Sequence, residues 1–151
     1  MVKMVQNESE KSRITESVLN TILEWFGIEV YRNEYIKEVK HCPFFAAYLK
    51  DEPIGFIALK KTSGVTGEIY CMGVMKEHHH KGYGKQLYKA IEEYARSEGL
   101  KLMQVKTVEK GTYDSYDQTN LFYESLGFMP LEVFKTLWDE HNPCLIYVKP
   151  L

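Results

Sequence analysis

Apolar residues recur at helical spacing in three stretches of this 151-residue chain. The pattern from Thr15 to Phe26 predicts a helix that Thr15 caps and Gly27 ends. A weaker pattern from Tyr31 to Val39 predicts a second helix. The clearest pattern runs from Leu87 to Ala95 and has one apolar face. It predicts an amphipathic helix that ends before Gly99.

Runs of strand length lie between and after these helices. They are Phe44–Leu49, Ile54–Leu59, Glu68–Val74, Met103–Val108, Phe128–Leu137 and Cys144–Val148. The first two runs flank a short polar step and predict an antiparallel hairpin, while residues 120–126 predict a short helix after a polar loop over residues 109–118. This order predicts an α/β (α+β) fold, a mixed and mostly antiparallel twisted sheet of about six or seven strands flanked by helices on both faces.

Length and composition favour a single domain over residues 1–151, preceded by a loosely ordered polar tail over residues 1–11. The net charge of -2 gives no general attraction to nucleic acid. No apolar stretch reaches the roughly 20 residues of a membrane span, and no signal peptide is visible. We therefore expect a cytoplasmic protein that binds neither nucleic acid nor membrane.

The three cysteines, Cys42, Cys71 and Cys144, are widely spaced and odd in number. They fit neither a disulfide framework nor a zinc motif, so we expect reduced, structural thiols. His78, His79 and His80 are consecutive, and consecutive loop residues point in different directions. No metal site is expected there.

The segment from Met75 to Lys85 joins a predicted strand to a predicted helix through Gly82 and Gly84. Glycines let the backbone approach a phosphate, and a helix start offers unpaired N–H groups and the positive end of the helix dipole. Lys81 and Lys85 add charge. The spacing excludes the dinucleotide fingerprint and the Walker A loop, so by itself the segment predicts an anion site or an ordinary helix entry.

The same segment resembles the signature of the GNAT superfamily of N-acetyltransferases: Gln or Arg, two residues, Gly, one residue, then Gly or Ala. Gly82 and Gly84 match the small positions, and His79 stands at the Gln or Arg position. Downstream, residues 121–128 (LFYESLGF) resemble the family's Phe-Tyr-Glu-x-x-Gly-Phe junction between helix and strand. The likeness covers roughly Glu68 to Phe128.

The resemblance implies acetyl-CoA as cosubstrate, with pantetheine along the strand that carries Met72, Gly73 and Val74, and a cofactor cleft between that strand and Met103–Val108. Gly73 would suit a bulge there. The implied cofactor-binding residues are Met72, Gly73, Val74, His79, His80, Lys81, Gly82, Tyr83, Gly84 and Lys85, with Asn120 as a substitute for the family's asparagine. A protonated His79 would contact phosphate.

The resemblance also implies two catalytic residues. Tyr123 would protonate the departing thiolate, the alternative being a tyrosine packed at a helix end. Glu68 would serve as general base, the alternative being a solvated charge at a strand end. Asp139, Glu140 and His141 would either attract a cationic acceptor or form a solvated turn.

We therefore expect direct acetyl transfer to a primary amine of a small molecule or peptide, catalysed by a monomer or homodimer. Transfer through a covalent intermediate on Cys71 is less favoured, because no activating base lies near it in the sequence. An acyl-CoA-binding regulatory module without turnover is the main alternative. A third possible function is generic binding of a nucleotide or phosphate.

Overall fold

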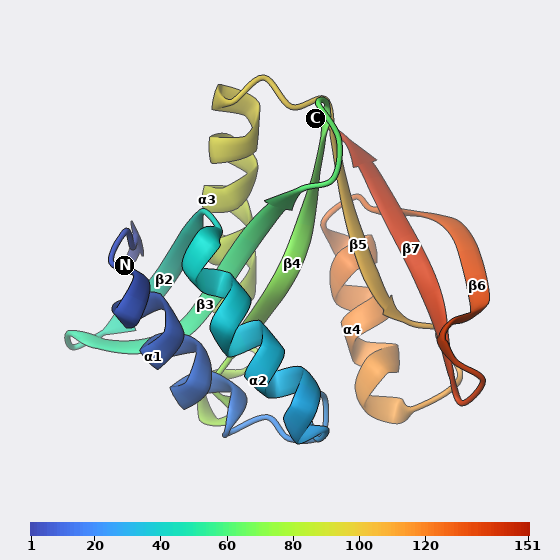
Figure 1. Ribbon diagram of the computed structural model, residues 1–151, viewed down its shortest axis with the longest axis horizontal. Helices are drawn as coiled ribbons and strands as arrows, with labels where there is room; N and C mark the ends of the chain where they lie inside the picture. Colours follow the sequence, from blue (N-terminus) through green and yellow to red (C-terminus); the bar gives the residue numbers. More distant parts are fainter. The chain divides into compact units, whose positions relative to one another are not determined.

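The computed structural model describes residues 1–151, which form seven strands and four α-helices. The strands are hydrogen-bonded in the order β1-β2-β3-β4-β5-β7-β6, and β4 pairs with β5 in parallel (Figure 1). The expected mixed, mostly antiparallel sheet is thus confirmed. No helix is long and apolar enough to cross a membrane.

The chain divides into two compact units, which are described separately. The first comprises Met1–Lys60 and Ile69–Glu98, and the second comprises Lys61–Glu68 and Gly99–Leu151. Strand β4 (Thr66–Val74) contributes to both units. The single-domain prediction stays a prediction.

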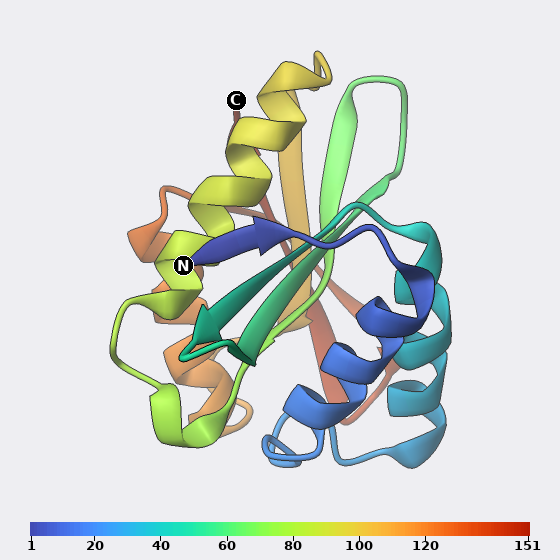
Figure 2. The ribbon, with the colours of Figure 1, turned by 90° about the vertical axis from the view of Figure 1, so that its left-hand side faces the viewer.

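In the first unit, the helices lie on two sides of the strands. The strands are β1 (Val2–Met4), β2 (Phe44–Leu49), β3 (Glu52–Lys61) and the Ile69–Val74 part of β4. Helices α1 (Glu8–Leu19) and α2 (Glu29–Glu38) lie on one side, and α3 (Tyr83–Ser97) lies on the other (Figure 2). Two 3₁₀ turns, η1 (Val39–His41) and η2 (Lys76–His78), complete it.

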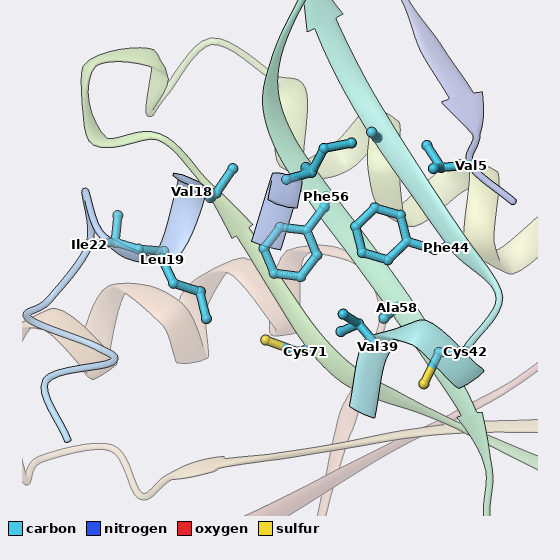
Figure 3. Close-up of a cluster of buried hydrophobic side chains, with 12 residues drawn as sticks. Val5, Val18, Leu19, Ile22, Val39, Cys42, Phe44, Phe56, Ala58 and Cys71 are labelled. Atoms are coloured by element: carbon cyan, nitrogen blue, oxygen red, sulfur yellow. The ribbon is translucent and has the colours of Figure 1, made fainter. Parts of the chain in front are cut away.

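The core beneath α1 is aromatic at its centre. Phe44 of β2 and Phe56 of β3 stack with parallel rings whose centroids are 5.3 Å apart, and both side chains are fully buried (Figure 3). Val18 and Leu19 of α1 pack into the same cluster. The hairpin predicted from the apolar runs pairs antiparallel as expected.

The first helix begins earlier than Thr15. Asn7 caps α1, because its Oδ1 accepts the Glu10 N–H at 2.9 Å, whereas Thr15 is buried inside the helix and its hydroxyl donates to Lys11 O. The buried face includes Lys11, whose Nζ donates to Cys42 O at 2.7 Å. A lysine at a buried position conceals the helical pattern, which explains the error.

The expected loosely ordered tail over residues 1–11 is also wrong. Residues Val2–Met4 form β1, which pairs antiparallel with β2 (Val2 opposite Ala47), and α1 begins at Glu8. Strand β1 is held by backbone pairing to a strand more than forty residues away. No local pattern could have indicated it.

The second unit contains β5 (Leu102–Val108), β6 (Met129–Asp139), β7 (Asn142–Pro150) and α4 (Asp114–Ser125). Strand β7 pairs antiparallel with both β5 and β6. Helix α4 begins six residues before the predicted position, because most of its first half is polar and only Asn120 and Tyr123 are buried. The other strand predictions hold to within a few residues.

Candidate functional site

The glycine-containing segment enters α3 through a left-handed residue. Gly82 is the N-cap of α3 and has a φ of 87°, a conformation that side chains disfavour. Its carbonyl accepts the Gln86 N–H at 3.2 Å. The backbone N–H groups of Tyr83, Gly84 and Lys85 belong to the first turn and lack partners within the helix. The predicted glycine-capped helix start is therefore present in the first unit.

Helix α3 is held in place by its apolar face, which buries Leu87, Tyr88, Ile91 and Ala95. It packs against β2 and β1. The basic side chains Lys81 and Lys85 are exposed beside the helix start, and so is His80, which has a φ of 60°. Positive charge near a helix N-terminus that is open to solvent favours a bound anion such as phosphate.

Strand β4 ends at Val74 immediately before this loop. Gly73 is buried, and a Cβ there would lie 2.8 Å from Ile22 Cδ1 and 3.2 Å from Val18 Cγ1. Its φ is not in the left-handed region. A larger residue here would have to displace the Ile22 and Val18 side chains, so glycine is favoured by packing against α1 and the turn after it, a different reason from the bulge expected from the sequence.

His79 lies between the strand and the helix, and its ring is half-buried. Its Nε2 lies 2.6 Å from Val74 O, and the ring meets Trp25 edge to face with centroids 5.6 Å apart. Because a carbonyl oxygen can only accept, the ring must carry a hydrogen on Nε2. The imidazole is therefore bonded to the end of β4.

In the second unit, Glu68 is buried at the start of β4, with a relative exposure of 7%. Its Oε1 accepts from Gln104 Nε2 at 2.9 Å and forms an ion pair with Lys106 Nζ at 3.0 Å. The alternative of a solvated charge at a strand end is therefore wrong. Lys106 and Gln104 are neighbours of Glu68 that the sequence did not indicate.

Tyr123 is buried in the last turn of α4, where its ring contacts Phe122, Phe128 and Tyr147. Helix α4 ends in a Schellman motif, because Phe128 N–H donates to Tyr123 O and Gly127 N–H donates to Glu124 O, both at 3.1 Å. Gly127 has a φ of 96°. The junction motif seen in the sequence is thus a helix end that fixes Tyr123.

Asn120 has no free group for a cofactor. It is fully buried, its Nδ2 donates to Val108 O at 3.0 Å and Tyr116 O at 2.6 Å, and its Oδ1 accepts from Tyr147 Oη at 2.9 Å. The expectation that Asn120 binds the cofactor is therefore corrected. Asn120 joins α4 to β5 and β7.

Tyr147 belongs to the same network, and sequence reasoning missed it. Its single hydroxyl hydrogen is shared between Asn120 Oδ1 and Glu124 Oε2, each 2.9 Å from Tyr147 Oη, and Lys110 Nζ lies 3.1 Å from Glu124 Oε1. Burial, followed by the hydrogen bond to Glu124, raises the pKa of Tyr147 above its ordinary value. The bond from Tyr147, followed by Lys110, lowers the pKa of Glu124.

All three cysteines are free and buried. Burial raises the pKa of the Cys71 thiol well above its ordinary value. No group of three or more His, Cys, Asp or Glu side chains is arranged to hold a metal ion.

Taken together, the fold and the glycine-capped helix start define an α/β protein in which a basic loop leads from a strand into a helix. Residues 11–128 match the model of the acetyltransferase (GNAT) family, so the chain belongs to that family. It is 32% identical over 99 residues to a Bacillus subtilis (strain 168) protein named uncharacterized N-acetyltransferase YsnE. The match covers 66% of this chain and 64% of the length of that relative.

Two solved structures share the fold. One, from Desulfovibrio desulfuricans and assigned to the GNAT family, has a TM-score of 0.86 at 17% identity and covers 99% of this chain and 98% of its own. The other is a GNAT family acetyltransferase from Elizabethkingia anophelis with acetyl-CoA bound. Its TM-score is 0.70 at 18% identity, and the match covers 88% of this chain and 90% of that one.

Proposed function

We propose that this protein transfers an acetyl group from acetyl-CoA directly to a primary amine. The observation that carries the proposal is the Gly82-capped start of α3 directly after β4, in a chain that belongs to the acetyltransferase (GNAT) family. A helix start of this kind suits the pyrophosphate of coenzyme A. The acetyl-CoA bound by the Elizabethkingia anophelis relative supports the choice of cofactor.

The cofactor is held by backbone groups more than by side chains. The N–H groups at the start of α3 bind the pyrophosphate, and Lys81 and Lys85 add positive charge. The backbone of Met72, Gly73 and Val74 pairs with the pantetheine amides, and a backbone N–H near Val74 polarises the thioester carbonyl. The buried position of Gly73 supports this arrangement, because it leaves the end of the strand without a bulky side chain.

Catalysis then requires two proton transfers. The amine loses a proton to a base, its nitrogen attacks the thioester carbonyl carbon, the carbon–sulfur bond breaks, and the thiolate takes a proton. We assign the acid to Tyr123, which the helix end holds in one orientation. We assign the base to Glu68, whose Oε1 is held by Gln104 and Lys106 and whose second oxygen would receive the proton directly or through a water.

The transfer is direct, without an acyl-enzyme intermediate. A nucleophilic cysteine needs an accessible thiolate, whereas Cys71 is buried and burial raises its pKa. The acceptor is a small-molecule or peptide amine.

Calorimetry with acetyl-CoA and thiol release with a panel of primary amines test the proposal. The panel should include amino acids, a polyamine, an aminoglycoside and a lysine-containing peptide. We expect binding and thiol release with at least one class. Binding without turnover for every amine would favour the regulatory module, and failure to bind any acyl-CoA would overturn the cofactor assignment.

A further inference from the structure

The segment between β4 and α3 is folded back on the strand that precedes it. His79 Nε2 donates to Val74 O at 2.6 Å, and the next N–H along the chain, that of Met75, donates to Ile54 O at 2.8 Å. The peptide group that joins Val74 to Met75 is therefore hydrogen-bonded through both its oxygen and its nitrogen. The end of β4 is fixed by β3 on one side and by the loop on the other.

A second segment of the first unit holds the same imidazole. Trp25 lies in the turn after α1, and its ring packs edge to face against His79 with an interplanar angle of 72°. Beside this contact, Lys76 Nζ forms an ion pair with Glu24 Oε2 at 2.8 Å. The His79 ring is thus confined between the end of β4 and the turn that carries Trp25.

This confinement bears on the conformation of the phosphate loop. His79 is followed by two left-handed residues, His80 with a φ of 60° and Gly82 with a φ of 87°, and then by the first turn of α3. The hydrogen bond from His79 to Val74 O therefore fixes the position of the loop that leads into α3 relative to the end of β4.

The distance between the end of β4 and the start of α3 matters because one cofactor molecule must contact both. In the proposed function, the pantetheine arm pairs with the end of β4 and the pyrophosphate binds at the start of α3. Two linked groups bind more tightly than either alone only when the geometry of the protein lets both bind at once. A loop displaced from Val74 would retain each half-site and lose the combined affinity.

We propose that His79 is a positioning residue, which Trp25 holds against Val74 O and which sets the distance between the acyl and pyrophosphate halves of the cofactor site. This role differs from direct contact between the His79 side chain and phosphate. It rests on the proposed function, since the two halves are those of acetyl-CoA.

The two roles predict different binding by fragments of the cofactor. We would measure affinities for acetyl-CoA, S-acetylpantetheine and the nucleotide half (3′-phospho-ADP) in wild type, His79→Ala, His79→Gln and Trp25→Ala. Loss of one hydrogen bond predicts about tenfold weaker acetyl-CoA binding in His79→Ala. Each fragment should bind His79→Ala as it binds wild type. Partial recovery is expected in His79→Gln, whose side-chain amide can donate to the same carbonyl.

Weaker binding of the nucleotide half by His79→Ala would show a phosphate ligand and overturn the positioning role. Unchanged binding of acetyl-CoA would overturn it too. If wild type binds no acetyl-CoA, the proposed function fails instead, and the two failures are distinguishable. His41→Ala, at an exposed histidine of η1, is the matched control.

The fluorescence of Trp25 provides an independent readout. The chain has two tryptophans, so Trp138→Phe leaves Trp25 as the only one. We expect its emission to differ between the His79→Ala and His79→Gln variants of that protein, with the Gln variant nearer to the parent. In kinetics, KM for acetyl-CoA should rise about tenfold in His79→Ala while kcat changes little, because the amine and Tyr123 are not affected. A fall in kcat alone would contradict the proposal.

Discussion

Phe128 and Tyr123 are joined through both backbone and side chains at the end of α4. The Phe128 N–H donates to Tyr123 O at 3.1 Å, and the two rings meet edge to face with centroids 5.7 Å apart. A Schellman motif characteristically pairs such a bond with an apolar contact across the helix end. The orientation of Tyr123 therefore depends on Gly127, which lets the chain reverse.

Gly127→Ala should destabilise the protein without a change in any side chain of the site. An alanine at a φ of 96° is strained, and the expected cost is about 1–2 kcal/mol in the free energy of unfolding. Urea unfolding measures it. Gly64→Ala is the matched control, because Gly64 has open space around its Cβ position and an ordinary φ, and it should change stability by less than about 0.5 kcal/mol.

Tyr123→Phe should lower kcat with little change in KM for acetyl-CoA. The ring contacts remain, and only the proton donor is lost, so we expect a fall of about 100-fold in kcat. Steady-state kinetics with the best amine acceptor measures it. Tyr94→Phe, which removes a hydroxyl that bonds to the exposed Glu98, should retain activity. If Tyr123→Phe loses stability but keeps kcat, the packed-tyrosine alternative is correct.

Glu68→Gln should lower kcat/KM for the amine at neutral pH by about 100-fold, because the base is removed while its size is kept. Binding of acetyl-CoA should not change. Glu93→Gln, on the exposed face of α3, serves as the control. Full activity in Glu68→Gln would mean that Glu68 only anchors Gln104 and Lys106, and that another group accepts the proton.

The amino-acid sequence was sufficient where one local pattern determined the structure. The apolar face of α3, the glycines before it and the hairpin of β2 and β3 depend on neighbours within a few residues. For the same reason the glycine-capped start of α3 could be predicted, since strand, glycine turn and helix follow one another directly.

Features that depend on distant partners escaped prediction. Strand β1 exists because it pairs with β2. The buried face of α1 includes Lys11, whose Nζ donates to the distant Cys42 O, so the first turns of this helix lack an apolar pattern although Asn7 caps them locally. The contact of His79 with Trp25 joins residues 54 positions apart, so no local pattern could indicate it. Asn120 was misjudged for the same reason, because Tyr147 lies on the last strand.

Tyr147→Phe should destabilise the second unit, because it deprives the buried Asn120 Oδ1 of its donor. An unsatisfied buried acceptor costs about 1–3 kcal/mol, which urea unfolding at pH 7 should detect. Asn120 has no charge, so the loss of stability that comes from its unsatisfied Oδ1 should persist at every pH at which the protein folds.

The hydrogen bond from Tyr147 to Glu124 adds a contribution to the free energy of unfolding that depends on pH. Because this bond lowers the pKa of Glu124 in the folded state, its stabilisation is complete above the ordinary value of 4.5 and is lost as the pH falls through the lowered pKa. The stability gap between wild type and Tyr147→Phe should therefore narrow below about pH 4.5, by a small amount, since Glu124 is open to solvent that screens its charge. In a Glu124→Gln background the gap should be independent of pH. A gap that widens on acidification would show that Tyr147 acts on another titrating group.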